Sequence, residues 1–255
     1  MKTPLTIIMP MAGRSGRFQG THQGSKYYLS TLGMPMYHWA LLSLPHNKAH
    51  RIITISLEKD REIATISRNR LPEQIRDKVE VFFIPDVLPG PAKTVSVVLS
   101  SIDRDSEIIV SHADQYLDWY ASHFIEYICR EKPDGCIPIV PMDVDDWGYV
   151  VVDIKTGEVA RVSEKVKTSY YATCGVYYFR NKEVLSEALE DEFRHFDRIK
   201  SEYYIGTAFN YMIGRSLRVL PYYLNRVVSM NTPDDFRNAI PFLSMLKDNM
   251  WLPER

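Results

Sequence analysis

The sequence predicts an α/β fold in which a mostly parallel sheet is flanked by helices. Short apolar or β-branched runs, typical of buried strands, alternate with longer stretches of helical character through the first half of the chain. Polar loops around Gly13, Gly90 and Asp114 follow predicted strands. Ligands in parallel sheets bind beyond the carboxyl ends of the strands. We therefore expect these three loops to meet at one edge of the sheet.

The first half supplies the predicted parallel strands. They are an apolar run at 5–9 and three β-rich runs at Arg51–Leu57, Val79–Ile84 and Glu107–Ser111. Helices are predicted between them, at 35–44, 58–70 and 94–101. Pro35 suits the first turn of the first helix and Pro45 lies beyond its end, because proline is tolerated only at a helix start. This alternation predicts a sheet with helices on both faces.

The second half is predicted to form a smaller, β-rich lobe. Its expected strands are an apolar run at 136–142, a hairpin over 149–153 and 159–162, a long strand at 170–179 and brief strands at 217–220 and 226–230. Helices are expected at 182–190 and 203–214, and a last helix begins with Thr232 as N-cap and Pro233 in its first turn. No linker separates the halves, so we expect one domain over 1–255, with halves at about 1–135 and 136–255.

Composition limits the function classes. The chain of 255 residues has 45% hydrophobic and 25% charged residues and a net charge of −1, which argues against a broad nucleic-acid or membrane-binding surface. Any phosphate binding is therefore local. Cys129, Cys136 and Cys174 lack metal-ligand spacing and are expected to be reduced thiols in a cytoplasmic protein. The N-terminal run, broken by Pro10, has neither the signal-peptide nor the membrane-span pattern.

The loop after the first strand has the composition of a phosphate site. Gly13 and Gly16 allow backbone N–H groups to approach a ligand closely, and Arg14, Arg17 and Lys26 add three positive charges. Such a loop suits a triphosphate, although a solvated basic loop has the same composition. Neither the P-loop string nor the dinucleotide-binding glycine pattern is present. The polar stretch 19–25 instead suggests a mobile flap.

These residues resemble a known signature. Pro10-Met11-Ala12-Gly13, followed by Arg17-Phe18 and Lys26-Tyr27, resembles the sugar-phosphate nucleotidyltransferases, especially the bacterial branch of capsule and surface-polysaccharide synthesis. The second glycine stands at Gly16, one position later than in the family, and Ser25 replaces a proline. The resemblance extends from about Ile7 to about Phe236. It implies a Rossmann-like, GT-A-type fold whose halves bind nucleotide and acceptor respectively. The implied reaction joins a nucleoside triphosphate to a phosphorylated acceptor, most often a sugar 1-phosphate, and releases pyrophosphate to give an NDP-sugar.

The resemblance also implies roles for residues in the first half. Arg17, Lys26 and Asp114 would be catalytic, and Asp114 would hold Mg²⁺, which favours one or two carboxylates with substrate phosphates. Taken alone, Asp114 could instead cap a turn, and the Gly90 loop could equally be a plain Pro-Gly turn. The implied nucleotide-binding residues are Met11, Ala12, Gly13, Arg14, Ser15, Gly16, Gly90, Lys93 and Thr94.

The second half carries the implied acceptor site. Glu164 and Lys165 match a Glu-Lys string, Gly175 lies in an A-x-x-G-x-Y strand, and Glu202 belongs to a G-E-Y-Y-like stretch. Their alternatives are a surface ion pair, a β-bulge and a charged first turn of a helix. Ser229 stands where many relatives have a second metal-binding aspartate. The acidic run at 143–146 is interpreted as a solvated loop.

Three other functions remain open. One is a cytidylyltransferase that acts on a non-sugar phosphate, such as a phosphorylated alcohol or amino-acid derivative, which the departures at His112 and Ser229 would suit. Another is a GT-A glycosyltransferase, but the Asp143-Val144-Asp145 string lacks the surrounding pattern. The third is a non-catalytic nucleotide-binding regulator, against which the intact Arg17 and Lys26 speak. The expected partners are the triphosphate and a phosphorylated small molecule, without nucleic acid or membrane; the oligomeric state is left open.

Overall fold

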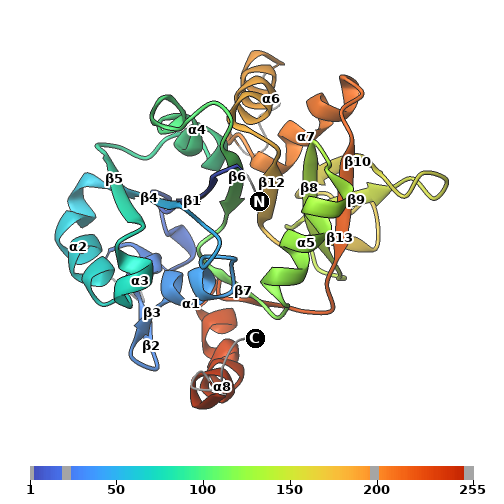
Figure 1. Cartoon of the computed structure of the whole chain (residues 1–255). Coiled ribbons are helices and arrows are strands. Elements are labelled where there is room, and N and C mark those ends of the chain that lie inside the picture. The colour runs from blue at the N-terminus through green and yellow to red at the C-terminus, as the bar shows by residue number, and fades with distance from the viewer. Residues whose placement is uncertain (1–2, 19–23, 196–200, 250–255) are drawn as a thin grey trace.

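A computed structural model of the chain describes residues 3–18, 24–195 and 201–249, and it confirms the α/β fold (Figure 1). Four strands form the parallel half of the central sheet: β1 (Leu5–Pro10), β4 (Arg51–Leu57), β5 (Val79–Ile84) and β6 (Glu107–Ser111). Strand β1 is fully buried and lies between β4 and β6. The order β6-β1-β4-β5 places the carboxyl ends of all four strands at the same edge.

The second half of the chain extends the same sheet with mostly antiparallel strands. These are β8 (Gly135–Pro141), β9 (Gly148–Val152), β10 (Val159–Glu164), β11 (Tyr171–Thr173), β12 (Val176–Phe179) and β13 (Val219–Tyr223). Strand β12 pairs antiparallel with β6 and so joins the two halves. Beyond it the order is β12-β8-β11-β9-β10, while β13 runs parallel to β8.

The prediction of one long strand at 170–179 is wrong in one respect, because this segment breaks into β11 and β12 at Gly175. This glycine has a φ of +65°, which is the left-handed region that other residues rarely adopt. A Cβ on Gly175 would lie 2.6 Å from Gln115 Oε1 and 2.8 Å from His112 Nδ1. The chain therefore turns sharply beside the loop that follows β6.

Helices cover both faces of the sheet. One face carries α1 (Met36–Leu42), α2 (Arg61–Asn69), α3 (Glu73–Arg76) and α5 (Ala121–Glu131), and the other carries α4 (Pro91–Ser96), α6 (Lys182–His195) and α7 (Ile205–Gly214). Neighbouring strand residues point to opposite faces, so Ile7 and Ile8 belong to different hydrophobic clusters. Figure 1 shows α4, α6 and α7 together along one side of the strands.

Several boundaries differ from the sequence prediction. Helix α5 and the four-residue α3 were not predicted, and α6 extends beyond the expected 182–190. The predicted helix 58–70 begins with a 3₁₀ turn, and 94–101 divides into α4 and a later 3₁₀ turn. Two small sheets complete the fold: β2 (Ser30–Thr31) with β3 (Met34–Pro35), and β7 (Gln115–Leu117) with β14 (Val227–Ser229). Residues 19–23 of the expected flap lie outside the described residues.

The last helix, α8 (Pro233–Asn249), begins where the sequence predicts it. Asp235 N donates to Thr232 Oγ1 at 3.0 Å, and Thr232 N donates to Asp235 Oδ2 at 3.2 Å. This reciprocal pair is a capping box, which satisfies backbone donors that the first helical turn leaves without partners. The helix packs against β14 through a separate hydrophobic cluster that includes Trp39, Met230 and Leu243. The start of α8 is thereby fixed beside β14, which pairs with β7 in the segment that follows β6.

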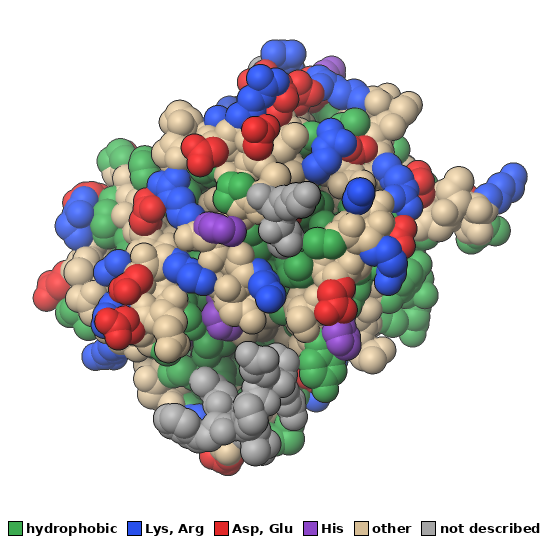
Figure 2. All heavy atoms as spheres, viewed as in Figure 1, with side chains coloured by type: hydrophobic (Ala, Val, Ile, Leu, Met, Phe, Trp, Pro, Cys, Tyr) green, Lys and Arg blue, Asp and Glu red, His purple; other side chains and the backbone are tan. Residues whose placement is uncertain are grey.

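The surface agrees with the near-zero net charge. Figure 2 shows Lys and Arg side chains interspersed with Asp and Glu over the visible face, and hydrophobic side chains scattered among them. In the described segments, no helix has both the length and the apolar character that crossing a membrane requires. These observations leave a local cavity as the place to look for a phosphate-binding site.

Candidate active site

A cavity of about 550 Å³ lies at the carboxyl edge of the parallel strands, between the two halves of the sheet. The loop after β1 lines one wall, with Gly13 as a member. The segment around Gly90 and the turn at Asp114 line it as well, so the three predicted loops converge as expected. The opposite wall comes from the second half of the chain and includes Glu164 and Gly175. A ligand in this cavity would therefore contact both halves.

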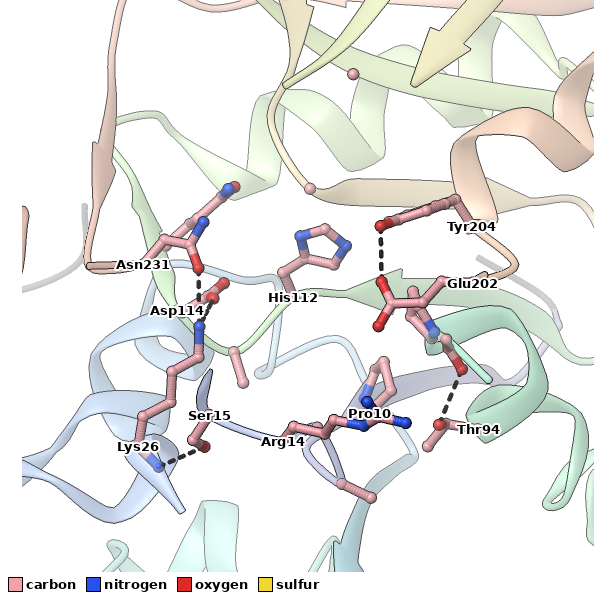
Figure 3. A pocket seen from close by; sticks show the side chains of 18 of the residues that line it. Pro10, Arg14, Ser15, Lys26, Thr94, His112, Asp114, Glu202, Tyr204 and Asn231 are labelled. Atoms are coloured by element: carbon pink, nitrogen blue, oxygen red, sulfur yellow. Dashed lines mark hydrogen bonds and ion pairs between the residues drawn. The ribbon is translucent and has the colours of Figure 1, made fainter. Parts of the chain in front are cut away.

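A buried lysine lines the cavity at one side, together with Asp114 and Asn231 (Figure 3). Lys26 Nζ donates to Asp114 Oδ2 at 2.6 Å and to Asn231 Oδ1 at 2.8 Å. Lys26 and Asp114 are each only 8% exposed. The backbone N–H of Lys26 donates to Ser15 Oγ at 2.9 Å, which ties the lysine to the loop after β1. The ammonium is thus held by two side chains from distant parts of the sequence, while the backbone of Lys26 is held by the loop after β1.

The ionisation of Asp114 depends on this pairing. Burial by itself raises the pKa of the carboxyl, but the charges of Lys26 and His112 and the hydrogen bonds outweigh burial, so the net pKa is lowered. The pKa of His112 is also lowered, but here burial is the main cause. The neighbouring Lys165 and Lys26 lower this pKa further, and together these effects outweigh Asp114, which raises it. The site therefore presents an ionised carboxylate beside a neutral imidazole at neutral pH.

The loop after β1 presents small and basic residues to the cavity. Ala12, Gly13, Arg14, Ser15, Gly16 and Arg17 all line it. Arg17 is at the rim, where its guanidinium lies 3.0 Å from Asp146 Oδ2 of the second half. Both side chains of this pair are more than 40% exposed, and exposed ion pairs of this kind contribute little free energy. Arg17 is therefore able to exchange Asp146 for a phosphate at small cost.

The Gly90 loop is packed against the second half through backbone contacts. Gly90 has a φ of +95°, and a Cβ there would lie 2.4 Å from the carbonyl oxygen of Tyr203. Tyr203 N donates to Pro89 O at 3.0 Å, and Ala92 N donates to Tyr203 O at 3.1 Å. Thr94 Oγ1 closes the loop by donating to Gly90 O at 3.1 Å. The glycine is required here for close backbone packing, which places Glu202 at the cavity wall.

Two residues expected at the nucleotide lie elsewhere. The Met11 side chain is fully buried in the hydrophobic cluster on the α1 side of the sheet and does not line the cavity. Lys93 also is not a lining residue, and its Nζ lies 3.4 Å from the centroid of the Phe193 ring on α6. Helix α4 begins at Pro91, so Lys93 falls on the helix face that meets α6. Neither side chain contributes to the described cavity.

The acceptor-side residues that the sequence singled out are brought together. Burial raises the pKa of the Glu164 carboxyl, although Lys165 Nζ lies 3.5 Å from its Oε1 and lowers it in part. Lys165 also donates to the carbonyl oxygen of Asp146 at 2.6 Å. Glu202 Oε2 accepts a hydrogen bond from the Tyr204 hydroxyl at 2.7 Å (Figure 3). This wall offers both donors and acceptors, as the recognition of a hydroxyl-rich molecule requires.

Gly175 has a more specific role than the sequence suggested. It lines the cavity, but the space that its Cβ would take is filled by the His112 ring and the Gln115 amide. His112 N donates to Gly175 O at 2.8 Å, and its ring meets Tyr177 edge-on at 6.0 Å between centroids. The absent side chain therefore makes room for His112, which points into the cavity in Figure 3.

Sequence reasoning missed Asn231, because it placed the possible ligand at Ser229. Ser229 does not line the cavity, and its hydroxyl donates to Asp235 Oδ2 at 3.2 Å. The signal was a polar residue directly after a predicted strand, which is too common to single out. Among the described residues, no group of three or more His, Cys, Asp or Glu is arranged to hold a metal ion. A cation at Asp114 would take its other ligands from amide, phosphate or water oxygens.

Comparisons with known proteins agree with this geometry. A family model described as nucleotidyl transferase matches residues 8–216. No significant match was found among curated proteins. The structure of a nucleoside-diphosphate-sugar pyrophosphorylase from Vibrio cholerae RC9 is similar, with 20% identity, a TM-score of 0.78, and coverage of 92% of this chain and 99% of that chain.

Two further solved structures are similar to a comparable degree. An inositol-1-phosphate CTP transferase from T. maritima has 14% identity and a TM-score of 0.77, and the match covers 96% of this chain and 97% of that chain. A UDP-glucose pyrophosphorylase complexed with UDP-glucose has 16% identity and a TM-score of 0.77, with 95% and 99% covered. At these identities the similarity establishes the fold.

Proposed function

Because the chain belongs to the nucleotidyl transferase family, we propose that it joins a nucleoside triphosphate to a sugar 1-phosphate and releases pyrophosphate. A phosphate oxygen of the acceptor attacks the α-phosphorus, the bond to the β-phosphate oxygen breaks, and an NDP-sugar forms. The similarity to a nucleoside-diphosphate-sugar pyrophosphorylase and to a UDP-glucose pyrophosphorylase favours a sugar acceptor. The resemblance around Pro10 and Arg17 favours a role of the product in surface-polysaccharide synthesis in the cytoplasm.

The observation that carries this proposal is the buried Lys26–Asp114 pair. It lies between the glycine-containing loop after β1 and the polar wall formed by Glu164 and Lys165. A cation fixed between two polar regions suits a reaction in which two phosphorylated molecules must approach each other despite their charges. A structural ion pair would not require a cavity with such walls on both sides.

Positioning and charge neutralisation account for the proposed mechanism. The N–H groups around Gly13 and the side chain of Arg17 would bind the β- and γ-phosphates and the leaving pyrophosphate. Lys26 would contact the α-phosphate and the incoming phosphate at the same time. A phosphate nucleophile is already ionised near neutral pH, so no side chain has to remove a proton. The protein thus supplies alignment and fixed charges, which are the main contributions in phosphoryl-transfer chemistry.

The acceptor is assigned to the wall of the second half. The buried Glu164 carboxylate would accept hydrogen bonds from hydroxyl groups, and the nearby Lys165 would approach the acceptor phosphate. Glu202, held by Tyr204, would accept from a further hydroxyl. Because these groups are fixed by hydrogen bonds and by burial, they favour one orientation of the acceptor.

Asp114 is the residue that fits a magnesium ion. Its lowered pKa keeps it ionised, and its carboxylate faces the same cavity as the loop that would hold the triphosphate. When bound, Mg²⁺ would neutralise charge on the phosphate oxygens. The remaining ligands would come largely from the nucleotide, because the described residues contain no larger acidic or histidine cluster.

A second candidate is a cytidylyltransferase with a phosphorylated alcohol as acceptor. The similarity to an inositol-1-phosphate CTP transferase favours it, as does His112 at a position where the family pattern has asparagine. Its pocket would use the same Lys26 and Asp114, so the two candidates differ only in base and acceptor. A single substrate screen therefore separates them.

The test is pyrophosphate release in the presence of Mg²⁺. Each of the four common ribonucleoside triphosphates and dTTP is combined with a panel of sugar 1-phosphates, polyol phosphates and the matching unphosphorylated sugars as controls. We expect release with one nucleotide and one sugar 1-phosphate, and none with the unphosphorylated control. Release with CTP and a polyol phosphate, and with no sugar 1-phosphate, would establish the second candidate. Formation of free nucleoside diphosphate would indicate glycosyl transfer, and triphosphate binding without any product would indicate a regulator.

A further inference from the structure

Two side-chain oxygens from distant segments converge on one cation in the cavity. Asp114 Oδ2 and Asn231 Oδ1 lie 2.6 Å and 2.8 Å from Lys26 Nζ, and Figure 3 shows both side chains directed at the ammonium. An ammonium group has only donors, so the Asn231 amide must present its oxygen rather than its nitrogen. The pair thus forms a small oxygen-lined cation site that includes a single negative charge.

The backbone holds Asn231 in this position from both sides. Met230, whose side chain is fully buried, donates its N–H to the carbonyl oxygen of Asp114 at 2.8 Å. Asn231 N donates to Ser229 Oγ at 3.3 Å, and Thr232 caps α8 immediately afterwards. The backbone of Asn231 is therefore held beside Asp114 by the fold and not by the lysine that lies between the two side chains.

The alternative ligand position does not have this geometry. Ser229 would have to turn its hydroxyl into the cavity, but that hydroxyl donates to Asp235 Oδ2 and accepts from Asn231 N. Moving it would break contacts that hold both Asn231 and the start of α8. A neutral amide oxygen and a carboxylate are both good ligands of hard divalent cations, whereas a serine hydroxyl is a poor one.

We propose that Asp114 and Asn231 together form the protein's part of a divalent-cation site, which Lys26 occupies in this structure. Resting on the proposed function, the inference is that triphosphate oxygens complete the coordination and that the Lys26 ammonium moves to the α-phosphate. The lysine and the metal ion then alternate at one pair of oxygens. Asn231 is assigned as a metal ligand, in place of the residue at position 229.

Charge and flexibility support this exchange. A divalent cation and an ammonium cannot share two oxygens, because like charges at such short range repel strongly. Lysine has a long flexible stem and its ammonium can be redirected without a change in the backbone. A triphosphate brings about four negative charges to the cavity, which gives the displaced ammonium a better partner than the one it leaves. With neutral Asn231, the bound metal also keeps a net positive charge toward the phosphates.

The first test asks whether lysine and metal compete. Mn²⁺ is titrated into the full chain without nucleotide, and free Mn²⁺ is measured by electron paramagnetic resonance. If Lys26 occupies the site, Lys26→Met should raise the affinity for Mn²⁺ about ten-fold, because it removes a competing charge beside the carboxylate. Unchanged or weaker Mn²⁺ binding in Lys26→Met would overturn the shared position.

The second test identifies the ligand. With Mn²⁺ and inorganic tripolyphosphate as the probe, Asn231→Leu should weaken Mn²⁺ binding about ten-fold, in the range typical for loss of a group that supports a metal site. Asn231→Asp, which keeps an oxygen in the same place, should bind at least as tightly as the wild-type chain. Ser229→Ala tests the alternative position; it removes one hydrogen bond to the backbone of Asn231, and we expect a loss of Mn²⁺ affinity clearly smaller than that of Asn231→Leu. Wild-type affinity in Asn231→Leu, or a loss in Ser229→Ala alone, would overturn the assignment.

These measurements do not depend on turnover, so the two proposals can fail separately. The variants could show the predicted Mn²⁺ affinities while no substrate pair releases pyrophosphate. That result would support the cation site and reject the proposed reaction. Pyrophosphate release together with an unchanged Mn²⁺ affinity in Asn231→Leu would support the proposed reaction and reject the cation site. Thermal unfolding of each variant without metal shows whether a change in Mn²⁺ affinity reflects the site or a loss of structure.

Discussion

Lys26 has two roles: it contributes to the stability of the fold, and it presents a positive charge to the cavity. Its ammonium is buried, so its pairing with Asp114 matters for stability, and it faces a cavity, so its charge is available to a ligand. Removing one partner of a buried pair leaves an uncompensated charge, which is costly, whereas replacing both partners often is not. The two roles can therefore be separated by substitution.

We predict that Lys26→Met lowers kcat by about 10² to 10³-fold, because its charge is aimed at the reacting phosphates. It should also reduce the free energy of unfolding by about 3 kcal/mol, since Asp114 loses its partner. The double variant Lys26→Met with Asp114→Asn should recover most of this stability but no activity. Steady-state kinetics and urea unfolding provide the two readouts. Near-wild-type turnover in Lys26→Met would remove this lysine from the mechanism.

Gly90 is a residue whose role is set by backbone packing. A Cβ would meet Tyr203 O at 2.4 Å and Tyr203 N at 2.6 Å, neither of which can move freely. We predict that Gly90→Ala destabilises the chain by about 3 kcal/mol or more, because strain and overpacking add. Gly157→Ala is the matched control: Gly157 also has a positive φ, of +72°, but nothing lies within 4 Å of its Cβ position. Its expected cost is about 1 kcal/mol, and equal costs in thermal unfolding would contradict the packing argument.

At the scale of elements, the sequence pattern predicted where strands lie more accurately than where a strand is interrupted. Buried runs such as β1 and β6 have a clear apolar pattern, and their ends place Gly13 and Asp114 correctly. The break at Gly175 was not predicted, because it depends on the rings and amides that approach from the loop after β6. Helix α5 was also missed, although Phe124, Ile125 and Ile128 form a buried face at helical spacing.

Helix α1 carries a histidine that makes the stability of this element depend on pH. Burial lowers the pKa of His38 from 6.5 to about 4, with a smaller lowering from Arg70, and a hydrogen bond with Ser67 opposes the shift in part. Between these two pKa values the unfolded chain binds the proton more readily than the folded chain does. Stability from this group is therefore complete above the unfolded pKa and is lost as the pH falls toward about 4.

We predict that the titration of His38 alone lowers the free energy of unfolding by about 2 kcal/mol when the pH falls from about 7 to about 5. His38→Gln removes the titrating group and keeps a polar side chain near Ser67, so its urea-unfolding midpoint should change less over the same range. The comparison of the two chains at both pH values cancels the contribution of other groups. Parallel pH dependence in wild type and variant would show that His38 stays protonated or accessible in the folded state.

At the scale of the whole molecule, the cavity depends on the joining of two halves. Lys26 and Asp114 come from the first half and Asn231 from the end of the second, and β12 connects the halves by pairing with β6. Sequence patterns predicted which loops gather at the carboxyl edge, because parallel strands impose that arrangement. They did not predict Asn231, which reaches the lysine across 205 positions of sequence. Contacts of this kind follow from tertiary packing, for which a single sequence has no local signal.

A continuous sheet across both halves predicts that the chain unfolds as one cooperative unit. The strands β6 and β12 are fully buried or nearly so, and the two main hydrophobic clusters each contain residues from both halves. Exposing one half would therefore expose the core of the other.

Native-state hydrogen exchange followed by mass spectrometry should give the same opening free energy for β4 in the first half and β8 in the second, equal to the global value from urea unfolding. A saturating triphosphate should raise both by the same amount, since it stabilises the single native state. Two distinct opening free energies, or protection by ligand in only one half, would instead divide the chain into two independently folding domains.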